Sequence, residues 1–343
     1  MHLTLLIPEL LWPEPADQAA LDQLACPTLE KLLGRARFQR QPRQALETCL
    51  AGILGTGPRS LAACRLAGES RDPGESSWYC ADPVHLQFHH ERIILGNAEL
   101  LALQTEEVEQ LLASLNRDFP DLGRFHAPHP QRWYLEAVPG LNLPPLPPPS
   151  AATGRQLGAL LPEAPDLARL LNELQMLLHT HPVNRAREAS RRPLVNGLWL
   201  WGGTGQAATA PGPERVWGDE PLLQGLARSS ARDARPRPPH AQAWLAASKA
   251  GGNPRELILL EQLLAPALVE DGDSWKAQVA DLERHWIAPL AQALGRELSR
   301  LTLLSPTAYG LLQWELGAAS RWQFWKSARP LATLARQLAD SPP

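Results

Sequence analysis

The sequence predicts an α/β protein whose sheet is mostly parallel and is covered by helices on both faces. Short apolar runs typical of buried strands, such as Leu3–Ile7 and Leu198–Trp201, alternate with segments of helical periodicity. Strands separated by helices are typical of parallel sheets, which bury both faces. Of the 343 residues, 44% are hydrophobic and 20% are charged, which is an ordinary globular composition.

The N-terminal part is expected to start with the strand at Leu3–Ile7, which the following proline ends. A helix-rich stretch over 17–33 comes next. Pro27 suits the first turn of its second helix, and Gly34 suits the position just after the helix end. A further helix is predicted over 45–54.

A small αβ subdomain is predicted over 78–138. Around 84–88 apolar and polar residues alternate, which indicates a half-buried strand, and 92–95 fits as its hairpin partner. A helix over 105–115 and a strand over 132–138 complete this stretch. Six prolines follow within 139–150, a composition that favours a stiff polyproline linker.

The C-terminal part is expected to contain helices over 257–264 and 275–294 and a strand over 301–304. We therefore predict a core formed by 1–77 and 181–343. The inserted αβ subdomain is predicted to span 78–180, with the proline-rich linker inside it.

Composition and charge exclude several classes of protein. The formal net charge is -3, whereas a protein that coats nucleic acid is usually basic, so a nucleic-acid partner is not expected. No apolar run reaches the roughly 20 residues of a membrane span, and the apolar start lacks the basic region of a signal peptide. The four cysteines lack zinc-site spacing. These features predict a cytoplasmic protein with free thiols and no membrane association.

The segment 181–205 carries the strongest chemical pattern. A turn, an arginine-bearing helix, a buried strand and a glycine loop follow one another, and ligands of open α/β sheets lie at the ends of strands. Glycines there let backbone N–H groups approach an anion, and an arginine binds phosphate or carboxylate in a bidentate manner. The alternative is that these residues only cap elements and form a tight turn. The predicted ligand-binding residues are Asn184, Arg187, Asn196, Gly202, Gly203 and Gly205.

The same segment resembles part of the archaeal-type cofactor-independent phosphoglycerate mutases, in which a His-Pro-x-Asn-x-x-Arg run precedes a hydrophobic strand and a glycine-rich loop. Here that run is His181 to Arg187. The whole chain looks closer still to bacterial regulatory proteins of the RpfE type, which share its MHLTLLIPEL start and its NGLWLWGG run. This resemblance implies an alkaline-phosphatase-like three-layer α/β core with a small inserted subdomain.

The chain departs from that superfamily where its enzymes hold two metals and a nucleophile. The first strand there ends in a metal-binding Asp-Gly, whereas here proline and Glu9 follow it. The nucleophile helix there carries Ser-Asp, whereas Thr48 is the only hydroxyl in the matching stretch here. The late strand there ends in Asp-His, and here Ser305 and Pro306 stand in its place. The resemblance and these departures predict a pseudoenzyme: a regulatory or ligand-binding protein with no catalytic residue, metal or cofactor, which retains an anion pocket.

Two alternatives remain open. One is a metal-dependent phosphoglycerate mutase or phosphatase with relocated ligands, for which Glu9, Asp271 and Asp273 are the available carboxylates. The other is a protein-interaction module that uses the tryptophan-rich C-terminal stretch over 314–329. The expected partners are accordingly a small molecule that bears phosphate or carboxylate and a protein that contacts this stretch.

Overall fold

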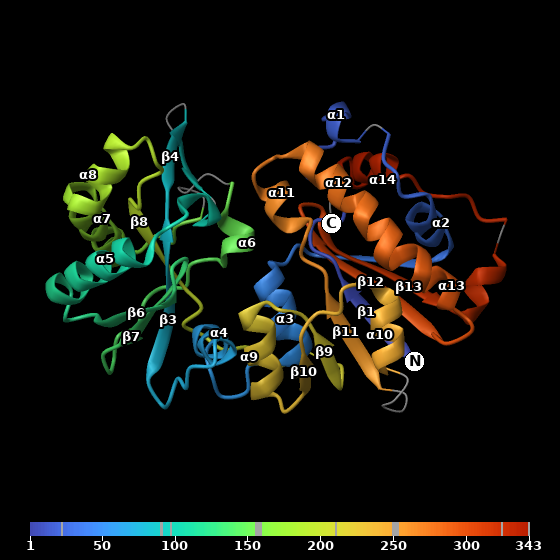
Figure 1. The fold of residues 1–343 in the computed structure, drawn as a ribbon, viewed down its shortest axis with the longest axis horizontal. Helices are drawn as coiled ribbons and strands as arrows, with labels where there is room; N and C mark the ends of the chain where they lie inside the picture. Colours follow the sequence, from blue (N-terminus) through green and yellow to red (C-terminus); the bar gives the residue numbers. More distant parts are fainter. Residues whose placement is uncertain are drawn as a thin grey trace. The chain divides into compact units, whose positions relative to one another are not determined.

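The structure, a computed structural model, divides into two units (Figure 1). The first unit comprises 1–49, 210–227 and 231–343, and the second comprises 50–209 and 228–230. The residues described are 1–21, 23–89, 92–96, 98–154, 160–209, 211–248, 254–323 and 325–341.

A seven-stranded sheet forms the centre of the first unit, in the order β10-β9-β11-β1-β12-β13-β2. The strands from β10 to β12 pair in parallel, whereas β13 runs antiparallel to both of its neighbours. This confirms the predicted α/β class with a mostly parallel sheet. The strands are β1 (His2–Leu6), β2 (Arg37–Gln41), β9 (Arg215–Trp217), β10 (Asp233–Arg235), β11 (Arg255–Leu259), β12 (Arg300–Thr307) and β13 (Gly310–Gly317).

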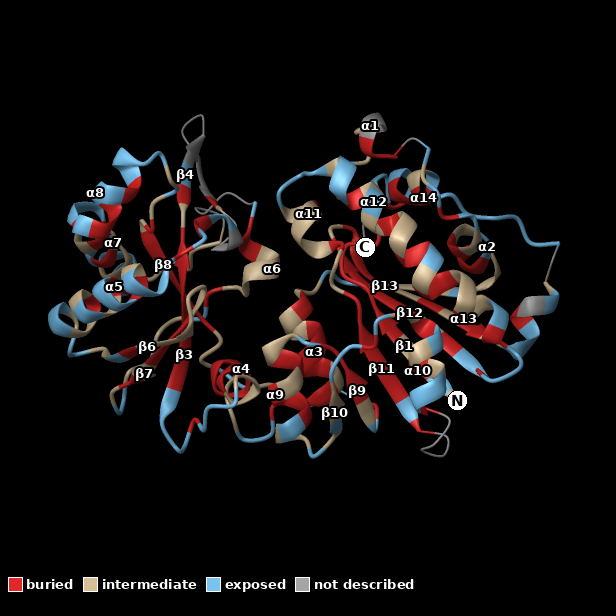
Figure 2. Ribbon diagram, in the orientation of Figure 1, coloured by how far each residue is buried: buried red, intermediate tan, exposed pale blue. Residues whose placement is uncertain are grey.

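Apolar side chains on one face of this sheet pack against helices to form a large core. Alternate residues of β1, Leu3 and Leu5, join it together with Trp275 of α12 and Leu334 of α14. Figure 2 shows the central strands of the sheet as buried along most of their length. The helices of this unit are α1 (Gln18–Leu21), α2 (Pro27–Arg35), α10 (Ala241–Ser248), α11 (Leu264–Leu268), α12 (Gly272–Leu282), α13 (Ala288–Ala293) and α14 (Leu331–Ala339), with a π-helical turn at Glu283–Ile287 and a 3₁₀ turn at Ala318–Trp322.

The start of α2 shows why the chain turns into a helix there. Pro27 takes a first-turn position, as predicted, where its missing N–H costs nothing. The buried Glu283 carboxylate then accepts hydrogen bonds from the N–H groups of Thr28 at 2.8 Å and Leu29 at 3.0 Å. A carboxylate at this end is also favoured by the helix dipole.

The second unit is built on a four-stranded antiparallel sheet in the order β6-β7-β3-β8. In Figure 1, α5, α7 and α8 group together beside this sheet, while α4 packs on β3. The strands are β3 (Ser77–Val84), β6 (Gly123–His129), β7 (Arg132–Ala137) and β8 (Gly197–Trp201), with a separate hairpin of β4 (Leu86–His89) and β5 (Arg92–Leu95). The helices are α4 (Leu61–Gly68), α5 (Thr105–Asp118), α6 (Pro149–Ala152), α7 (Pro165–Thr180) and α8 (Pro182–Ala189), with a 3₁₀ turn at Ala98–Leu101.

The division into units differs from the predicted boundaries at 78 and 180. β8 was expected in the core sheet, but it pairs antiparallel with β3, where Trp201 lies opposite Cys80. The glycine loop that follows β8 and the helix α4 are therefore part of the second unit as well. Two helices, α3 (Leu46–Leu54) and α9 (Pro221–Ser229), carry residues of both units in their sequences.

The proline-rich segment 139–150 lies wholly within the second unit, so it does not link the two units. Its carbonyl at Pro147 accepts a hydrogen bond from Trp199 Nε1 at 2.8 Å, and Leu146 forms a bridge with Trp201. The segment thus packs along β8 as a fixed part of the subdomain.

Two local predictions were wrong. The helix expected over 257–264 is not formed: 257–259 are the end of strand β11, whose short apolar run is buried between β1 and β9, and a helix, α11, begins only at Leu264. Gly34 does not follow the end of α2 but lies inside it, where a side chain would meet the carbonyl of Ser327 at 2.0 Å. No helix in the described part of the chain has the length and apolar character needed to cross a membrane.

Candidate functional site

Asn184 holds the start of α8 in place. Its side-chain Nδ2 donates to the carbonyls of Leu178 and Val195, both at 2.7 Å, and its Oδ1 accepts from the N–H of Val195 at 2.9 Å. Only 2% of the residue is exposed. The geometry therefore gives this predicted ligand-binding residue an internal, structural role.

Arg187 is also engaged inside the subdomain. It is 1% exposed, and its guanidinium donates to the carbonyls of Pro193 and Leu101 and to the carboxylate of Glu107. A buried arginine needs such partners, because an unpaired charge away from water is costly. These bonds leave α8 fixed against α5.

Asn196 continues the pairing of the sheet just before β8. Its Oδ1 accepts from the N–H of Leu86 at 2.6 Å, and its Nδ2 donates to the carbonyl of the same residue at 2.9 Å. The structure thus gives Asn184, Arg187 and Asn196 internal partners.

The predicted glycines form a close crossing between two loops. Gly202 has a positive φ of 72°, which favours glycine. A side chain on Gly203 would meet the ring of Tyr79 at 2.1 Å, and one on Gly205 would meet the carbonyl of Arg59 at 2.5 Å. The positive φ explains the glycine at 202, whereas Gly203 and Gly205 leave no room for a side chain beside Tyr79 of β3 and the segment 56–59.

A polar pocket opens where these loops meet, with a volume of about 460 Å³. We call it the glycine-loop pocket. Of the six predicted ligand-binding residues, Gly203 and Gly205 line it. Its lining comprises Gly57, Pro58, Arg59, Ser60, Ala63, Gly74, Glu75, Ser76, Ser77, Trp78, Gly203 and Gly205.

The N-terminus of α4 faces this region, but its first N–H groups are already used. Leu61 N donates to the carbonyl of Thr204 at 3.0 Å, and Ala62 N donates to that of Gly202 at 2.9 Å. Ala63 N donates to the side chain of the N-cap residue Ser60 at 3.2 Å. The glycine loop therefore supplies carbonyl acceptors to the helix, and the helix end is not open to an anion.

Arg59 is the cationic group of the pocket. It follows the Gly57-Pro58 turn and is half-buried, and within the described chain its guanidinium forms no ion pair. A guanidinium presents planar donors that match a carboxylate or phosphate. Glu75 lines the same pocket on its exposed side. Chemically, the pocket therefore suits a small anion that binds Arg59.

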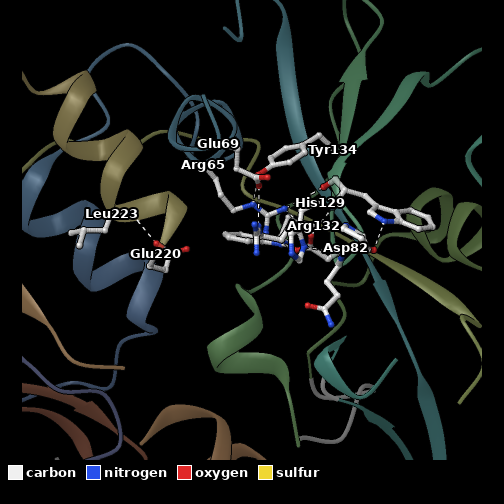
Figure 3. Close-up of polar contacts among 12 residues, drawn as sticks. Arg65, Glu69, Asp82, His129, Arg132, Tyr134, Glu220 and Leu223 are labelled. Atoms are coloured by element: carbon white, nitrogen blue, oxygen red, sulfur yellow. Dashed lines mark hydrogen bonds and ion pairs between the residues drawn. The ribbon is translucent and has the colours of Figure 1, made fainter. Parts of the chain in front are cut away.

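A buried ion pair fixes the elements behind the pocket (Figure 3). The Arg65 guanidinium of α4 binds the Asp82 carboxylate of β3 in a bidentate manner, at 2.7 and 2.8 Å. Trp201, the last residue of β8, donates its Nε1 to the same carboxylate at 2.8 Å. Burial alone would lower the pKa of Arg65, but the charge of Asp82, its hydrogen bonds to the guanidinium and the neighbouring Cys80 and Tyr134 together outweigh it, and the pKa is raised. The end of β8 and the start of the glycine loop are therefore held against α4.

The carboxyl end of β1 carries Glu9, which was considered above as a relocated metal ligand. Its Oε2 accepts from the N–H of Ala308 at 3.3 Å, and its carbonyl accepts from Trp275 Nε1 at 2.9 Å. Burial raises its pKa to about 7, against the opposing effects of the Arg43 charge and the Ala308 N–H. A carboxyl that keeps its proton near neutral pH must lose it before it binds a cation.

The residues present do not fit a two-metal centre. Asp271 caps α12, where its Oδ1 accepts from the N–H of Ser274 at 3.0 Å, and Asp273 is exposed in the first turn of that helix. Across the described residues, no three His, Cys, Asp or Glu side chains are grouped so that they could hold a metal ion. Glu9, Asp271 and Asp273 are thus not assembled into such a site.

The sequence did not single out Arg59 and Ser60 as site residues. The sequence does mark the start of a helix here, because a Gly-Pro turn followed by a serine directly before a helical segment is typical of an N-cap. Nothing in the sequence showed that this turn lies beside Gly203, since that contact depends on how β8 pairs with β3.

Comparison with known proteins shows likeness in structure and not in sequence. No protein-family model and no curated protein sequence matches the chain. Among solved structures, the chain is similar to the PH0037 protein from Pyrococcus horikoshii, with 12% identity, a TM-score of 0.56, and coverage of 99% of this chain and 95% of that one. It is also similar to the cofactor-independent phosphoglycerate mutase from Thermoplasma acidophilum, with 15% identity, a TM-score of 0.48, and coverage of 97% and 94%. The PH0037 likeness shows that the fold recurs in another protein.

Proposed function

We propose that this chain is a non-catalytic regulatory protein that binds a small phosphate- or carboxylate-bearing molecule in the glycine-loop pocket. The observation that carries the proposal is Arg59, a half-buried arginine without an ion pair in the described chain, in a polar pocket. In this view the protein is a degenerate relative of phosphoglycerate mutases, of the kind represented by RpfE-type regulators. Its four free, buried cysteines agree with a cytoplasmic location.

Three features support the non-catalytic part of the proposal. Glu9 is buried and hydrogen-bonded at the end of β1, and Asp271 is used as a helix cap. No metal-binding group occurs among the described residues. Phosphoryl transfer by a two-metal mechanism needs both cations to stabilise the attacking and leaving oxygens. The alternative of a metal-dependent mutase or phosphatase would need such a ligand set, and the described residues do not assemble one.

Calorimetric titration with phosphoglycerate tests the binding role. We expect the wild type to bind and Arg59→Ala to bind about tenfold or more weakly, because a charge-assisted hydrogen-bonded pair is lost. Arg169→Ala is the matched control, since that exposed arginine pairs with Asp166 on α7 and does not line the pocket. Equal affinity of the wild type and Arg59→Ala would refute the proposed site.

A turnover assay with manganese and phosphoglycerate tests the non-catalytic role. We expect no conversion above that of buffer. Manganese-dependent turnover that Thr48→Ala abolishes would show that the protein is an enzyme that requires Thr48, and would overturn the non-catalytic role.

A protein partner at the C-terminal stretch is a second candidate, favoured by two exposed tryptophans. Trp322 is 66% and Trp325 is 69% exposed, whereas Trp314 is fully buried in β13. Deletion of 314–329 would therefore damage the sheet, so the double variant Trp322→Ala/Trp325→Ala is the better test. We expect it to lose a pulled-down partner that the wild type retains, with unchanged circular dichroism. If the double variant still retained that partner, the surface around these two tryptophans would not be the partner's binding site.

A further inference from the structure

A second and larger pocket lies in the subdomain between α5, β6 and the segment 71–78. Its volume is about 740 Å³, within the range of roughly 300–1,000 Å³ typical of small-molecule sites. It shares Gly74, Ser76 and Trp78 with the glycine-loop pocket, but neither Arg59 nor Gly203 lines it. The two pockets therefore present different charged groups.

The aromatic wall of this pocket is fixed by its own contacts. Trp78 Nε1 donates to the carbonyl of Pro73 at 2.8 Å, and the Trp78 ring lies 5.4 Å from that of His126, centroid to centroid. The Glu136 carboxylate accepts from Ser76 Oγ at 2.7 Å and lies 3.2 Å from His126 Nε2. Side chains held in this way need little ordering when a ligand binds.

Arg124 lies directly opposite Glu136 in the pairing of β6 with β7. Residues opposite each other on antiparallel strands have Cβ atoms only about 5 Å apart, so the two side chains are close enough to form an ion pair. Instead, Glu136 binds Ser76 and His126, and in the described structure Arg124 forms no ion pair. The Arg124 guanidinium is therefore free to bind an added carboxylate.

The α5 wall supplies an opposite charge and an apolar surface. Glu109 lines the pocket and likewise forms no ion pair with any described residue. Leu112 and Ala113, from the next turn of the same helix, line it beside Phe125 of β6. A ligand that satisfies all three groups carries a carboxylate, an ammonium and an apolar side chain.

We propose that this pocket binds a free amino acid with an apolar side chain, whose carboxylate pairs with Arg124 and whose ammonium pairs with Glu109. The site adjoins the glycine-loop pocket, with which it shares Gly74, Ser76 and Trp78, but its charged residues are not shared with it.

Calorimetric titration of the full chain with leucine and phenylalanine tests this proposal. The matched analogues are isocaproate, which lacks the ammonium of leucine, and isoamylamine, which lacks its carboxylate. We expect binding of at least one amino acid, and affinities for both analogues lower by about tenfold or more, because each leaves one charged side chain unpaired. Absence of binding by both amino acids, or isocaproate binding as tightly as leucine, would overturn the proposal.

Variants assign the binding to this pocket. Arg124→Gln and Glu109→Gln should each weaken amino-acid binding about tenfold or more, whereas Arg117→Ala, on α5 but paired with Asp118 outside the pocket, should not. Ala113→Leu adds three carbon atoms to the pocket wall beside Glu109 without removing a hydrogen bond and should weaken binding, which serves as a second test if a charge variant folds poorly. Arg59→Ala should leave amino-acid binding unchanged even if phosphoglycerate binding fails. Unchanged binding by Arg124→Gln and Ala113→Leu would contradict the proposal.

Discussion

Glu9 combines two features that are unusual for one residue. Its backbone has a φ of 52°, a left-handed conformation that non-glycine residues seldom adopt, and its side chain is 7% exposed. The chain must turn there because the carbonyl of Pro306 binds its N–H at 2.9 Å, directly after β1. Strain and burial of this kind cost about 1–3 kcal/mol and persist where neighbouring contacts fix the geometry.

The raised pKa of Glu9 predicts a specific dependence of stability on pH. Burial raises the pKa from 4.5 to about 7, so the folded state retains a proton that the unfolded state has lost. The free energy of unfolding should therefore fall as pH rises from about 4.5 to 7, by on the order of 3 kcal/mol, and stay constant above. Glu9→Gln cannot ionise and should lack this fall.

Urea unfolding of the wild type and Glu9→Gln at pH 5 and pH 8 measures the difference. The exposed Glu163→Gln variant is the control and should follow the wild type. If Glu9→Gln lost as much stability between the two pH values as the wild type does, the carboxyl of Glu9 would not be the group that titrates.

The Arg65–Asp82 pair predicts a large effect of a conservative change. Both side chains are nearly inaccessible, at 6% and 7% exposed. Asp82→Asn leaves the arginine charge buried without its partner, so the free energy of unfolding should fall by about 3–5 kcal/mol in chemical denaturation. Asp118→Asn breaks an exposed pair with Arg117 and should have no measurable effect. A similar small effect of both variants would mean that Arg65 finds other partners.

Among the elements, α2 depends on a glycine within it for a close contact. The segment 327–329, which precedes α14, lies against this helix. A Cβ on Gly34 would meet the carbonyl oxygen of Ser327 at 2.0 Å. The N–H of Arg329 donates to the carbonyl of Glu30 at 2.9 Å. Glycine is poor in a helix, so its presence there has a steric cause.

Gly34→Ala should therefore loosen the C-terminal segment. Helix propensity alone would stabilise the variant by about 1 kcal/mol, whereas the clash of the added Cβ with the Ser327 carbonyl costs about 1–3 kcal/mol. We therefore expect a net loss of stability. Hydrogen exchange should quicken in α14, and the Tm should fall. Gly317→Ala, which has no atom within 4 Å of the added Cβ, is the control. A higher Tm for Gly34→Ala would show that the segment can move away at no cost.

Local sequence patterns predicted many helices and strands correctly. The elements that these patterns missed depend on strand pairing between distant parts of the sequence. The strand β1, the start of α2 at Pro27 and the helix α5 have clear apolar periodicity and end signals, and the structure confirms them. The run of β11 is too short to distinguish a buried strand from a helix. Its identity follows from pairing with β1 and β9, which lie far away in the sequence.

The candidate site shows the same limit. The predicted glycine loop does line a pocket, through Gly203 and Gly205. The polar residues expected beside it, Asn184 and Arg187, instead make internal hydrogen bonds, because their partners Val195 and Glu107 lie within reach only in the folded subdomain. A residue type that suits a ligand also suits a buried structural role, and the sequence does not tell the two apart.

For the whole molecule, the chain keeps an α/β fold that recurs in PH0037 while its described residues assemble no metal centre. Fold alone does not determine function, which depends on the residues at the site. We propose that the glycine-loop pocket, with Arg59, binds a small anion without converting it.

Phosphorus NMR of phosphoglycerate mixed with the protein tests this claim most directly. Spectra in manganese-free buffer report binding. Samples incubated with manganese report conversion once the manganese has been removed by chelation, because manganese itself broadens phosphate resonances. An enzyme of ordinary turnover, about 10 per second, would convert the substrate within minutes. We predict a phosphate resonance that broadens or shifts with the wild type, sharpens with Arg59→Ala, and yields no product signal over hours. A product signal that grows with protein concentration, or a resonance that the wild type leaves unchanged, would contradict the account.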